Sequence, residues 1–289
     1  MHTSIFQRAL VTLSCFFFLS ACHAPLAQSN SSISVPLEQN TSEEFAPLSP
    51  EVYPSHSETD EEIWDVSDVD ISDVDKTRKL LSFTFDDAPS RSLERILAVF
   101  AAFNESNPDC PASATFFLNG IRFDSNTPHT LTAALTLGME LGNHSYTHYD
   151  LTTLEETKLR TEIDDTDKLL CAIDGRERHL FRAPFGKVNE LVRSVVHTPI
   201  FDWTIDTLDW TGISENEIYE KVWSDKYPGA IVLMHDGYEN TVSALKRLLP
   251  DLKEAGYQVT SISKMAKAHD CPLRKGSVYI RARKNGVGT

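Results

Sequence analysis

Basic residues are missing from a long stretch near the amino terminus of this 289-residue chain. No Lys or Arg lies between Ala9 and Asp75, whereas 13 Asp or Glu lie between Cys22 and Asp75. Residues 76–289 carry 29 acidic and 26 basic side chains, so the formal net charge of −15 belongs mainly to the leader. Because the rest of the chain is nearly neutral and has no basic footprint, we expect no nucleic-acid partner.

A long membrane-spanning run is also missing. The apolar stretch from Ala9 to Leu19 follows Arg8 and is shorter than the roughly 20 residues a helix needs to cross a bilayer, so residues 1–21 are predicted to be a signal peptide. The tetrapeptide LSAC that ends at Cys22 resembles the bacterial lipobox, in which the cysteine is lipidated. We therefore expect an exported lipoprotein, anchored in a cell-envelope membrane through Cys22 and facing the periplasm or the outside.

Large apolar residues are scarce from Cys22 to Asp75, where Ser, Pro, Glu and Asp dominate. Such a segment buries too little surface to offset its ordering entropy, and its Asp repeats lack the spacing and glycine of an EF-hand. We predict four segments: the signal peptide 1–21, an acidic disordered tether 22–75, a catalytic domain 76–270, and a basic solvated tail 271–289.

Cysteine is scarce in the predicted mature chain. Beyond Cys22 only Cys110, Cys171 and Cys271 remain, and none belongs to a CxxC pair, so a cysteine zinc site is not expected. Their odd number permits at most one internal disulfide.

Predicted strands and helices alternate after residue 79. The predicted strands cover 79–85, 113–118, 139–141, 179–181, 199–205, 230–234 and 257–261, and the predicted helices 91–105, 128–137, 154–173, 188–197, 214–226 and 242–255. Strands that alternate with helices favour a parallel sheet, which seven strands close or nearly close into a barrel.

The first predicted strand ends at two adjacent carboxylates, Asp86 and Asp87. Parallel α/β enzymes hold their chemistry at the carboxyl ends of strands. Adjacent side chains of a regular strand point to opposite faces, so we expect one Asp to bind a metal and the other to move protons. The alternative is that one of them only caps the helix that begins near Arg91.

Two histidines four residues apart, His144 and His148, follow the third predicted strand. On a helical turn they face the same way, which suits two ligands of one metal ion. This spacing also arises by chance, so their position after a strand is what favours a metal site.

Three further polar motifs follow other strands. They contain Arg182, Asp209 beside Trp210, and His235. In a barrel these positions meet at one mouth together with the carboxylates and histidines, as in an active site. Taken singly, Arg182 also fits an ordinary salt bridge and Trp210 an ordinary core position.

Five motifs occur in the order TFDDAPS, HSYTH, RAPFG, DTLDW and LMH. Together they resemble the five ordered motifs of the polysaccharide deacetylase family, the NodB-homology domain of carbohydrate esterase family four, over about residues 79–267. The resemblance implies a distorted (β/α) barrel with about seven parallel strands. It also implies metal-dependent removal of acetyl groups from sugars, usually N-acetyl groups of GlcNAc polymers.

The resemblance implies a role for each motif residue. Asp87, His144 and His148 would bind the metal, Asp86 would be the base oriented by Arg182, His235 would be the acid paired with Asp209, Trp210 and Leu233 would line the acetyl pocket, and the backbone N–H of Phe185 would face the oxyanion. Two positions depart from the family pattern: Ala88 replaces the usual Gly, and Phe185 replaces the commoner Tyr. A methyl group at residue 88 would add strain if that position needed a positive φ.

The chemistry independently favours these residue types. Two imidazoles and one carboxylate suit one divalent metal ion, zinc first, with cobalt or nickel as alternatives. No Ser, Cys or Lys nucleophile accompanies the motifs. We expect a monomeric N-deacetylase that acts on GlcNAc of peptidoglycan or of a chitin-like polymer. The alternatives are an O-acetyl esterase on xylan or another acetylated glycan, and an inactive carbohydrate-binding member.

Overall fold

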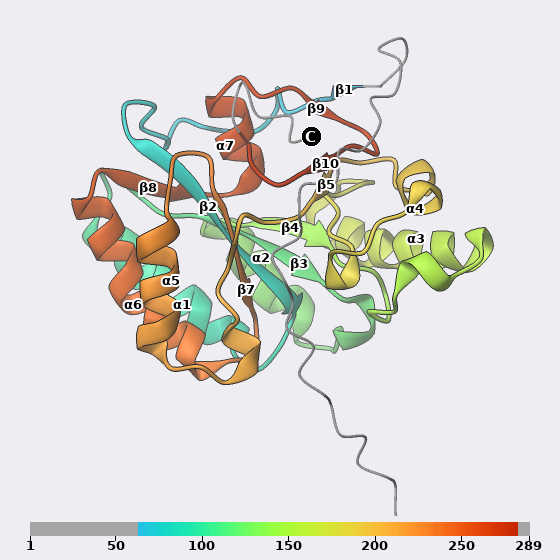
Figure 1. The fold of residues 1–289 in the computed structure, drawn as a ribbon, viewed down its shortest axis with the longest axis horizontal. Coiled ribbons are helices and arrows are strands. Elements are labelled where there is room, and N and C mark those ends of the chain that lie inside the picture. The colour runs from blue at the N-terminus through green and yellow to red at the C-terminus, as the bar shows by residue number, and fades with distance from the viewer. Residues whose placement is uncertain (1–62, 283–289) are drawn as a thin grey trace, which may run out of the picture. The chain divides into compact units, whose positions relative to one another are not determined.

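The computed structural model describes residues 63–282 (Figure 1). The predicted signal peptide, the lipidation site Cys22 and residues 22–62 of the predicted tether lie outside the described residues. Within the described part, no helix is both long enough and apolar enough to cross a membrane.

The central strand is β2 (Lys79–Ala88), which pairs in parallel with three other strands. They are β3 (Ala114–Leu118), β7 (Ile231–His235) and β8 (Tyr257–Thr260). The sheet continues from β3 to β4 (Glu140–Asn143) and from β7 to β6 (Ile205–Asp206). This parallel α/β architecture is the one predicted from the sequence.

One segment, 200–206, joins the two edges of the sheet. Its first part, β5 (Ile200–Phe201), pairs with β10 (Val278–Tyr279) and bridges to Phe181, which in turn bridges to Asn143 at the end of β4. Its last part is β6, the partner of β7. The sheet is thus joined into a distorted barrel, as expected.

The strands predicted at 179–181 and 199–205 are shorter than expected. The first is reduced to the bridge residue Phe181, and the second is interrupted between β5 and β6. The interruption has a physical cause, because the backbone changes partners there. Asp202 N donates to Tyr279 O, whereas Thr204 N donates to Ile231 O on the other edge.

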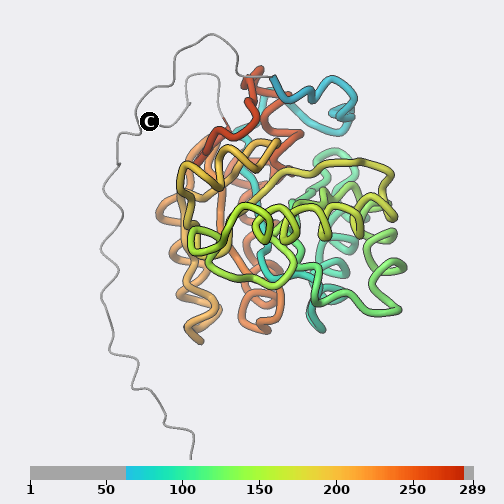
Figure 2. The backbone as a smooth tube through the Cα atoms, turned by 90° about the vertical axis from the view of Figure 1, so that its right-hand side faces the viewer, coloured from blue at the N-terminus to red at the C-terminus, as the bar shows by residue number. Residues whose placement is uncertain are grey.

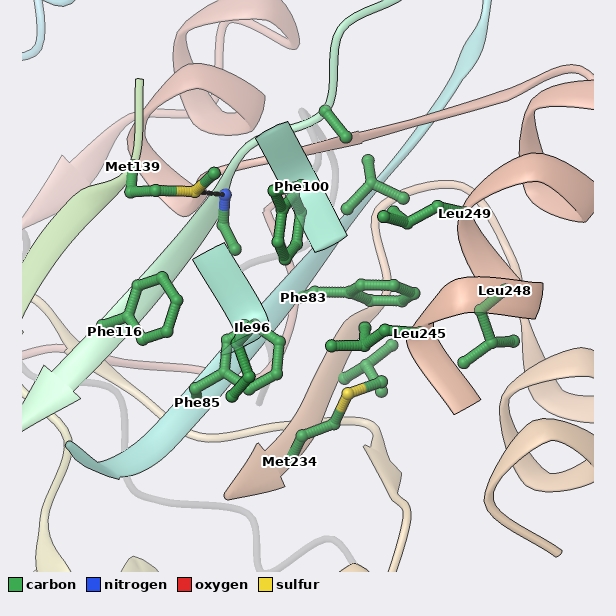
Figure 3. Packing of buried hydrophobic residues seen from close by; sticks show 14 of the residues in the cluster. Phe83, Phe85, Ile96, Phe100, Phe116, Met139, Met234, Leu245, Leu248 and Leu249 are labelled. Carbon is green, nitrogen blue, oxygen red and sulfur yellow. Dashed lines mark hydrogen bonds between the residues drawn. The ribbon is translucent and has the colours of Figure 1, made fainter. Parts of the chain in front are cut away.

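Helices cover the outside of the barrel (Figures 1 and 2). They are α1 (Leu93–Ser106), α2 (Thr127–Thr136), α3 (Glu156–Asp174), α4 (Glu190–Val195), α5 (Glu215–Asp225), α6 (Glu239–Glu254) and α7 (Ile262–Ala268). Figure 3 shows the main core, where Phe83 and Phe85 of β2 meet Phe100 of α1 and Leu245 of α6. These apolar side chains are fully buried, so their removal from water is the main force that attaches the helices.

Strand β2 alternates between this core and the barrel interior. Leu81, Phe83 and Phe85 belong to the core, whereas Thr84 and Asp86, also buried, hydrogen-bond to Arg182 on the opposite face. Because successive side chains of a strand point to opposite faces, the apolar side chains of β2 face outward to the helices and the polar ones face inward to the site.

The predicted tether is wrong for residues 63–75, which belong to the fold. Strand β1 (Ile63–Trp64) pairs with β9 (Leu273–Arg274), and Trp64 and Val74 pack against a buried cluster. Asp73 Oδ2 lies 2.6 Å from Lys264 Nζ. A few apolar side chains, together with contacts to distant backbone and Lys side chains, suffice to order this acidic stretch.

The predicted solvated tail is also wrong for residues 271–282. Leu273, Tyr279 and Ala282 are buried, and β10 extends the sheet beside β5. Figure 2 shows this carboxy-terminal segment, in red, near the first described residues, in blue. The folded domain therefore extends beyond the predicted limits of 76–270 at both ends.

Candidate active site

The residues singled out from the sequence lie at the carboxyl ends of the strands. His235 ends β7 and Asp86 lies two residues before the end of β2, and their Cα positions are direct partners in the parallel ladder. His144 follows β4, Arg182 follows the bridge residue Phe181, and the short 3-10 helix η4 (Asp209–Thr211) follows β6. The topology thus gathers five separate motifs at one edge, as the barrel hypothesis predicted.

Asp87, His144 and His148 form a candidate metal site. Their ligand atoms lie within 4.8 Å of one another. Asp87 Oδ1 lies 3.5 Å from His148 Nε2 and has no hydrogen-bond partner among the described residues, although it is buried. A buried carboxylate oxygen without a donor is costly unless a cation satisfies it, so this donor set fits a divalent metal.

The protonation of His144 supports the same conclusion. Its Nδ1 lies 2.8 Å from Arg182 O, and a carbonyl oxygen can only accept a hydrogen bond. Nδ1 is therefore the donor in this contact, and Nε2 faces Asp86 Oδ2 at 3.6 Å. A backbone carbonyl on the far nitrogen is a common way to orient a metal-binding imidazole.

An irregularity in β2 brings the two aspartates together. The register with β3 shifts between Phe85 and Ala88, and Asp87 has a φ of +63°. The expectation that the two side chains diverge as on a regular strand is therefore wrong, because a bulge redirects the second one. Ala88 is not among the positive-φ positions, so the replacement of Gly there introduces no strain of that kind.

Left-handed backbone recurs in the loop that carries the histidines. Ser145 and His148 have φ values of +65° and +61°. His148 N donates to Ser145 Oγ at 3.1 Å, and Ser145 N donates to Asn143 Oδ1 at 2.9 Å. These internal hydrogen bonds hold a conformation that non-glycine residues seldom adopt, as is typical of functional sites. The two histidines thus share a turn rather than one face of a regular helix.

Asp86 is held by a fully buried arginine. Arg182 Nη1 donates to Asp86 Oδ1 at 2.8 Å and to Thr84 Oγ1 at 2.7 Å, while Nε donates to Phe201 O at 2.8 Å. Burial alone would raise the pKa of Asp86, but Arg182 and two nearby histidines outweigh it and lower that pKa below its ordinary value. Asp86 is therefore ionised at neutral pH and can accept a proton.

His235 is held by a buried carboxylate. Asp209 Oδ1 lies 2.8 Å from His235 Nδ1, and Asp209 Oδ2 accepts from His235 N at 2.8 Å and from Thr241 Oγ1 at 2.6 Å. Burial lowers the pKa of His235, but the hydrogen bond and charge of Asp209 outweigh it and raise the pKa above its ordinary value. The imidazole is thus prepared to carry a proton.

The three predicted substrate-contact residues differ in exposure. Phe185 has a φ of +60°, is 60% exposed, and its ring centroid lies 4.7 Å from that of His148. Trp210 is 50% exposed in η4, so it is not a core residue. Leu233 is buried on β7, two residues before His235 and hence on the same face of the strand.

Several contacts were not predicted from the sequence. Thr84 precedes Asp86 by two residues, so strand alternation could have identified it. Asp202 gave no such signal: its backbone oxygen accepts from Arg182 at 3.0 Å, and burial raises the pKa of its carboxyl to about 7. Asp236, which accepts from Ser90 N at 2.6 Å, was also missed.

Known proteins share this fold. The polysaccharide deacetylase family model matches residues 73–198. A peptidoglycan-N-acetylglucosamine deacetylase of Bacillus cereus is 30% identical over 204 residues, which cover 68% of this chain and 92% of that relative. The chain therefore belongs to the polysaccharide deacetylase family.

Two longer relatives point to different glycans. The peptidoglycan-N-acetylmuramic acid deacetylase PdaC of Bacillus subtilis is 30% identical over 66% of this chain and 40% of its own length. A bifunctional xylanase/deacetylase of Pseudobutyrivibrio xylanivorans is 32% identical over 66% of this chain and 31% of its own length. The chain thus spans less than half of either relative. A structure of Bacillus subtilis PdaC superposes with a TM-score of 0.63 at 30% identity, covering 68% of this chain and 94% of that one.

Proposed function

We propose that this protein removes acetyl groups from N-acetylated sugars of a cell-wall or extracellular polysaccharide, with GlcNAc of peptidoglycan or of a chitin-like polymer as the substrate. The main support is that the site holds two titratable side chains, each fixed by a charged partner of its own. Asp86 lies against Arg182, and His235 lies against Asp209, both beside the candidate metal ligands. The peptidoglycan deacetylases among the relatives support the substrate class.

The two pairs divide the proton transfers. Asp86 takes a proton from the attacking water, whose oxygen bonds to the acetyl carbon. The carbon–nitrogen bond then breaks as His235 gives its proton to the leaving nitrogen, so the products are acetate and a free amine. A divalent cation held by Asp87, His144 and His148, with zinc ahead of cobalt or nickel, supplies a Lewis acid and a water of lowered pKa when bound.

The groups around this centre fit the substrate roles predicted for them. The exposed rings of Phe185 and Trp210 offer apolar surface to a sugar or an acetyl methyl, and Leu233 adds a buried apolar side chain. The turn Pro184–Gly186 presents the backbone N–H of Phe185 to the oxyanion in this proposal.

The proposed location is a cell-envelope membrane, on the side that faces the periplasm or the outside. It depends on the signal peptide and lipobox of the sequence, and the anchor at Cys22 would hold a monomer near its polymer. Both features lie outside the described residues.

Acetate release from three glycans tests the proposal. The purified full chain, supplied with zinc, is incubated with peptidoglycan, chito-oligosaccharides and acetylxylan, and the product masses are recorded. We expect acetyl loss from the first two. Acetyl loss from acetylxylan alone would instead identify an O-acetyl esterase, the activity suggested by the xylanase/deacetylase relative.

Two variants address the inactive alternative. Asp86→Asn and His235→Ala each remove one proton-transfer group, and we expect turnover to fall by about 10²- to 10⁴-fold in either. A wild-type protein that binds the glycans and releases acetate no faster than both variants would be a carbohydrate-binding member.

A further inference from the structure

A polar groove with a volume of about 420 Å³ adjoins the candidate metal site. Residues within 89–94, from the end of β2 into the first turn of α1, line one part of it, and residues within 122–130, from η1 (Gly120–Arg122) into the first turn of α2, line another. The groove is connected to the metal ligands through Arg122, whose Nη2 lies 3.9 Å from Asp87 Oδ2. The proposed deacetylation does not use this groove.

The two carboxylates that line the groove already accept hydrogen bonds. Glu94 Oε1 accepts from Asn126 Nδ2 at 3.2 Å and from Thr130 Oγ1 at 3.4 Å. Asp124 Oδ1 accepts from Asn126 N at 3.0 Å and from Thr127 N at 2.9 Å. Both carboxylates thus hold the beginning of α2 in place.

The guanidinium of Arg122 is placed differently. Its side chain is 44% exposed, and its distance of 3.9 Å from Asp87 is too long for a hydrogen bond. A cation bound by Asp87 would cancel most of the attraction between the two groups. Arg122 then presents hydrogen-bond donors to the groove at its metal end.

The backbone fixes Arg122 relative to the metal ligands. Ile121 N donates to Tyr146 O at 2.9 Å, and Gly120 N donates to Ser145 O at 3.2 Å. Gly120 packs so closely against the Tyr146 ring that a β-carbon there would clash with it. The short helix η1 (Gly120–Arg122) is therefore attached to the loop that carries both histidines.

Two other charged residues near Arg122, Asp236 and Arg91, bear on whether an anion can bind there. Asp236 is not among the residues that line the groove; it is 2% exposed, and its two oxygens accept from Ser90 N and Ser90 Oγ. Arg91 also lines the groove and adds a second positive charge. A ligand that reaches the metal through this groove thus meets the donors of Arg122 and Arg91, and each lining carboxylate has one oxygen engaged in hydrogen bonds.

We propose that Arg122 binds a carboxylate carried by the glycan, on a sugar next to the one that is deacetylated. A planar guanidinium matches a carboxylate with two parallel hydrogen bonds, which gives both strength and orientation. Two sources offer this group: the lactyl ether of muramic acid and a uronic acid. The inference rests on the proposed deacetylase function and narrows its substrate to acidic glycans.

Matched substrates isolate the carboxylate. The first pair is a GlcNAc–MurNAc oligosaccharide and the same compound with its carboxyl converted to an amide. The second pair is an oligosaccharide in which GlcNAc alternates with glucuronic acid, and the same compound with its carboxyls converted to amides. In each pair, only the charged member offers a carboxylate to Arg122. We expect the wild-type protein to have a higher kcat/KM for the charged member in at least one pair. The pair that shows this difference identifies whether the natural carboxylate belongs to muramic acid or to a uronic acid.

Substitution of Arg122 tests the contact itself. Arg122→Gln should lower kcat/KM for the charged substrate by about 10- to 100-fold and reduce its ratio to the neutral one toward unity. Arg122→Lys keeps the charge but loses the two-point geometry, so an intermediate ratio is expected. Arg160→Gln, an exposed arginine on α3 paired with Glu156, is the matched control and should keep the wild-type ratio.

Metal content, measured on the same samples, separates the two explanations of an effect. Equal losses on charged and neutral substrates, or a loss of metal in Arg122→Gln, would mean that Arg122 only positions Asp87, and the proposal would be wrong. A wild-type protein that deacetylates both members of each pair equally also overturns it while leaving the deacetylase function intact. Release of acetate from chito-oligosaccharides but from none of these glycans would overturn the proposal and leave the deacetylase function intact, whereas release from none of them, chito-oligosaccharides included, would refute both.

Discussion

Replacement of Asp209 by asparagine tests the origin of the proposed acid. Asp209 is completely buried and accepts hydrogen bonds from His235 N, His235 Nδ1 and Thr241 Oγ1. An asparagine of the same shape can keep its oxygen toward His235 N and Thr241. Its NH₂ group then faces His235 Nδ1, which must change from donor to acceptor.

The change removes a charge-assisted hydrogen bond, which contributes about 1.5–3 kcal/mol. Part of this loss is offset because a buried negative charge disappears, so we expect the free energy of unfolding to fall by about 1–2 kcal/mol. The effect on protonation is more specific. Burial lowers the pKa of His235, and Asp209 raises it. The variant keeps the effect of burial and loses most of the effect of Asp209, so the pKa of His235 should be lower than in the wild type.

The sign of the activity change follows. His235 must be protonated when the amine leaves, so turnover declines as pH rises through its pKa. A lower pKa moves this basic limb toward lower pH, and at neutral pH turnover falls by up to about 10²- to 10⁴-fold, the usual contribution of general acid catalysis. The acidic limb, which reports Asp86, should stay in place.

The assay is kcat against pH on an N-acetylated oligosaccharide, with metal content and unfolding by urea measured in parallel. Asp174→Asn is a suitable control, because Asp174 also lies beside a buried histidine, His179, at 3.2 Å from Nε2, but away from the catalytic motifs. It should lose stability without any movement of the basic limb. An unmoved basic limb in Asp209→Asn would refute the assignment of His235 as the acid tuned by this carboxylate.

Four other outcomes are expected. Exhaustive chelation should abolish acetate release and added zinc should restore it, and full turnover without metal would contradict the metal requirement. His148→Ala should lower metal content and activity together, since two protein ligands hold a cation weakly; wild-type metal content by elemental analysis would show that His148 is not a ligand. Cys22→Ala should move the protein from the membrane to the soluble fraction with unchanged turnover, and a wild-type protein without acyl chains by mass spectrometry would refute lipidation. Burial lowers the pKa of His179, but Asp167 and Asp174 outweigh it and raise that pKa above 6.5. The stabilisation that protonated His179 gives the fold is therefore complete below about pH 6.5 and is lost as pH rises through the raised pKa. Urea unfolding should show this loss of stability in the wild type and not in His179→Gln.

Local patterns predicted most of the barrel. The alternation of Leu81, Phe83 and Phe85 with polar residues marks β2, and helical spacing marks the buried face of α1 at Ile96 and Phe100. Because parallel strands share one carboxyl edge, the order of the motifs along the chain was enough to predict which side chains would meet.

Long-range packing was not predictable from the same patterns. Residues 63–75 look disordered by composition, yet they are ordered by partners about 190 residues away, such as Lys264 for Asp73. The β2 bulge at Asp87 was also missed, because a strand pattern carries no signal for one irregular residue. Arg122 was not singled out for a related reason: its proposed role depends on the contact between η1 and the histidine loop, which no local spacing encodes.

The most informative difference between sequence and structure concerns two histidines of the same site. In the sequence, His144 and His235 are both histidines that follow a buried strand. The spacing to His148 favoured His144 as a metal ligand, whereas only the family resemblance assigned His235 as the acid. In the structure the partner of Nδ1 separates them: a carbonyl oxygen for His144, and a carboxylate for His235. A carbonyl fixes the tautomer but adds no full charge, so Nε2 keeps its lone pair for a metal. A carboxylate also stabilises the imidazolium, so His235 Nε2 can hold a proton and then give it away. In the proposed mechanism, the different roles of the two imidazoles therefore follow from the partners of Nδ1, on the far side of each ring.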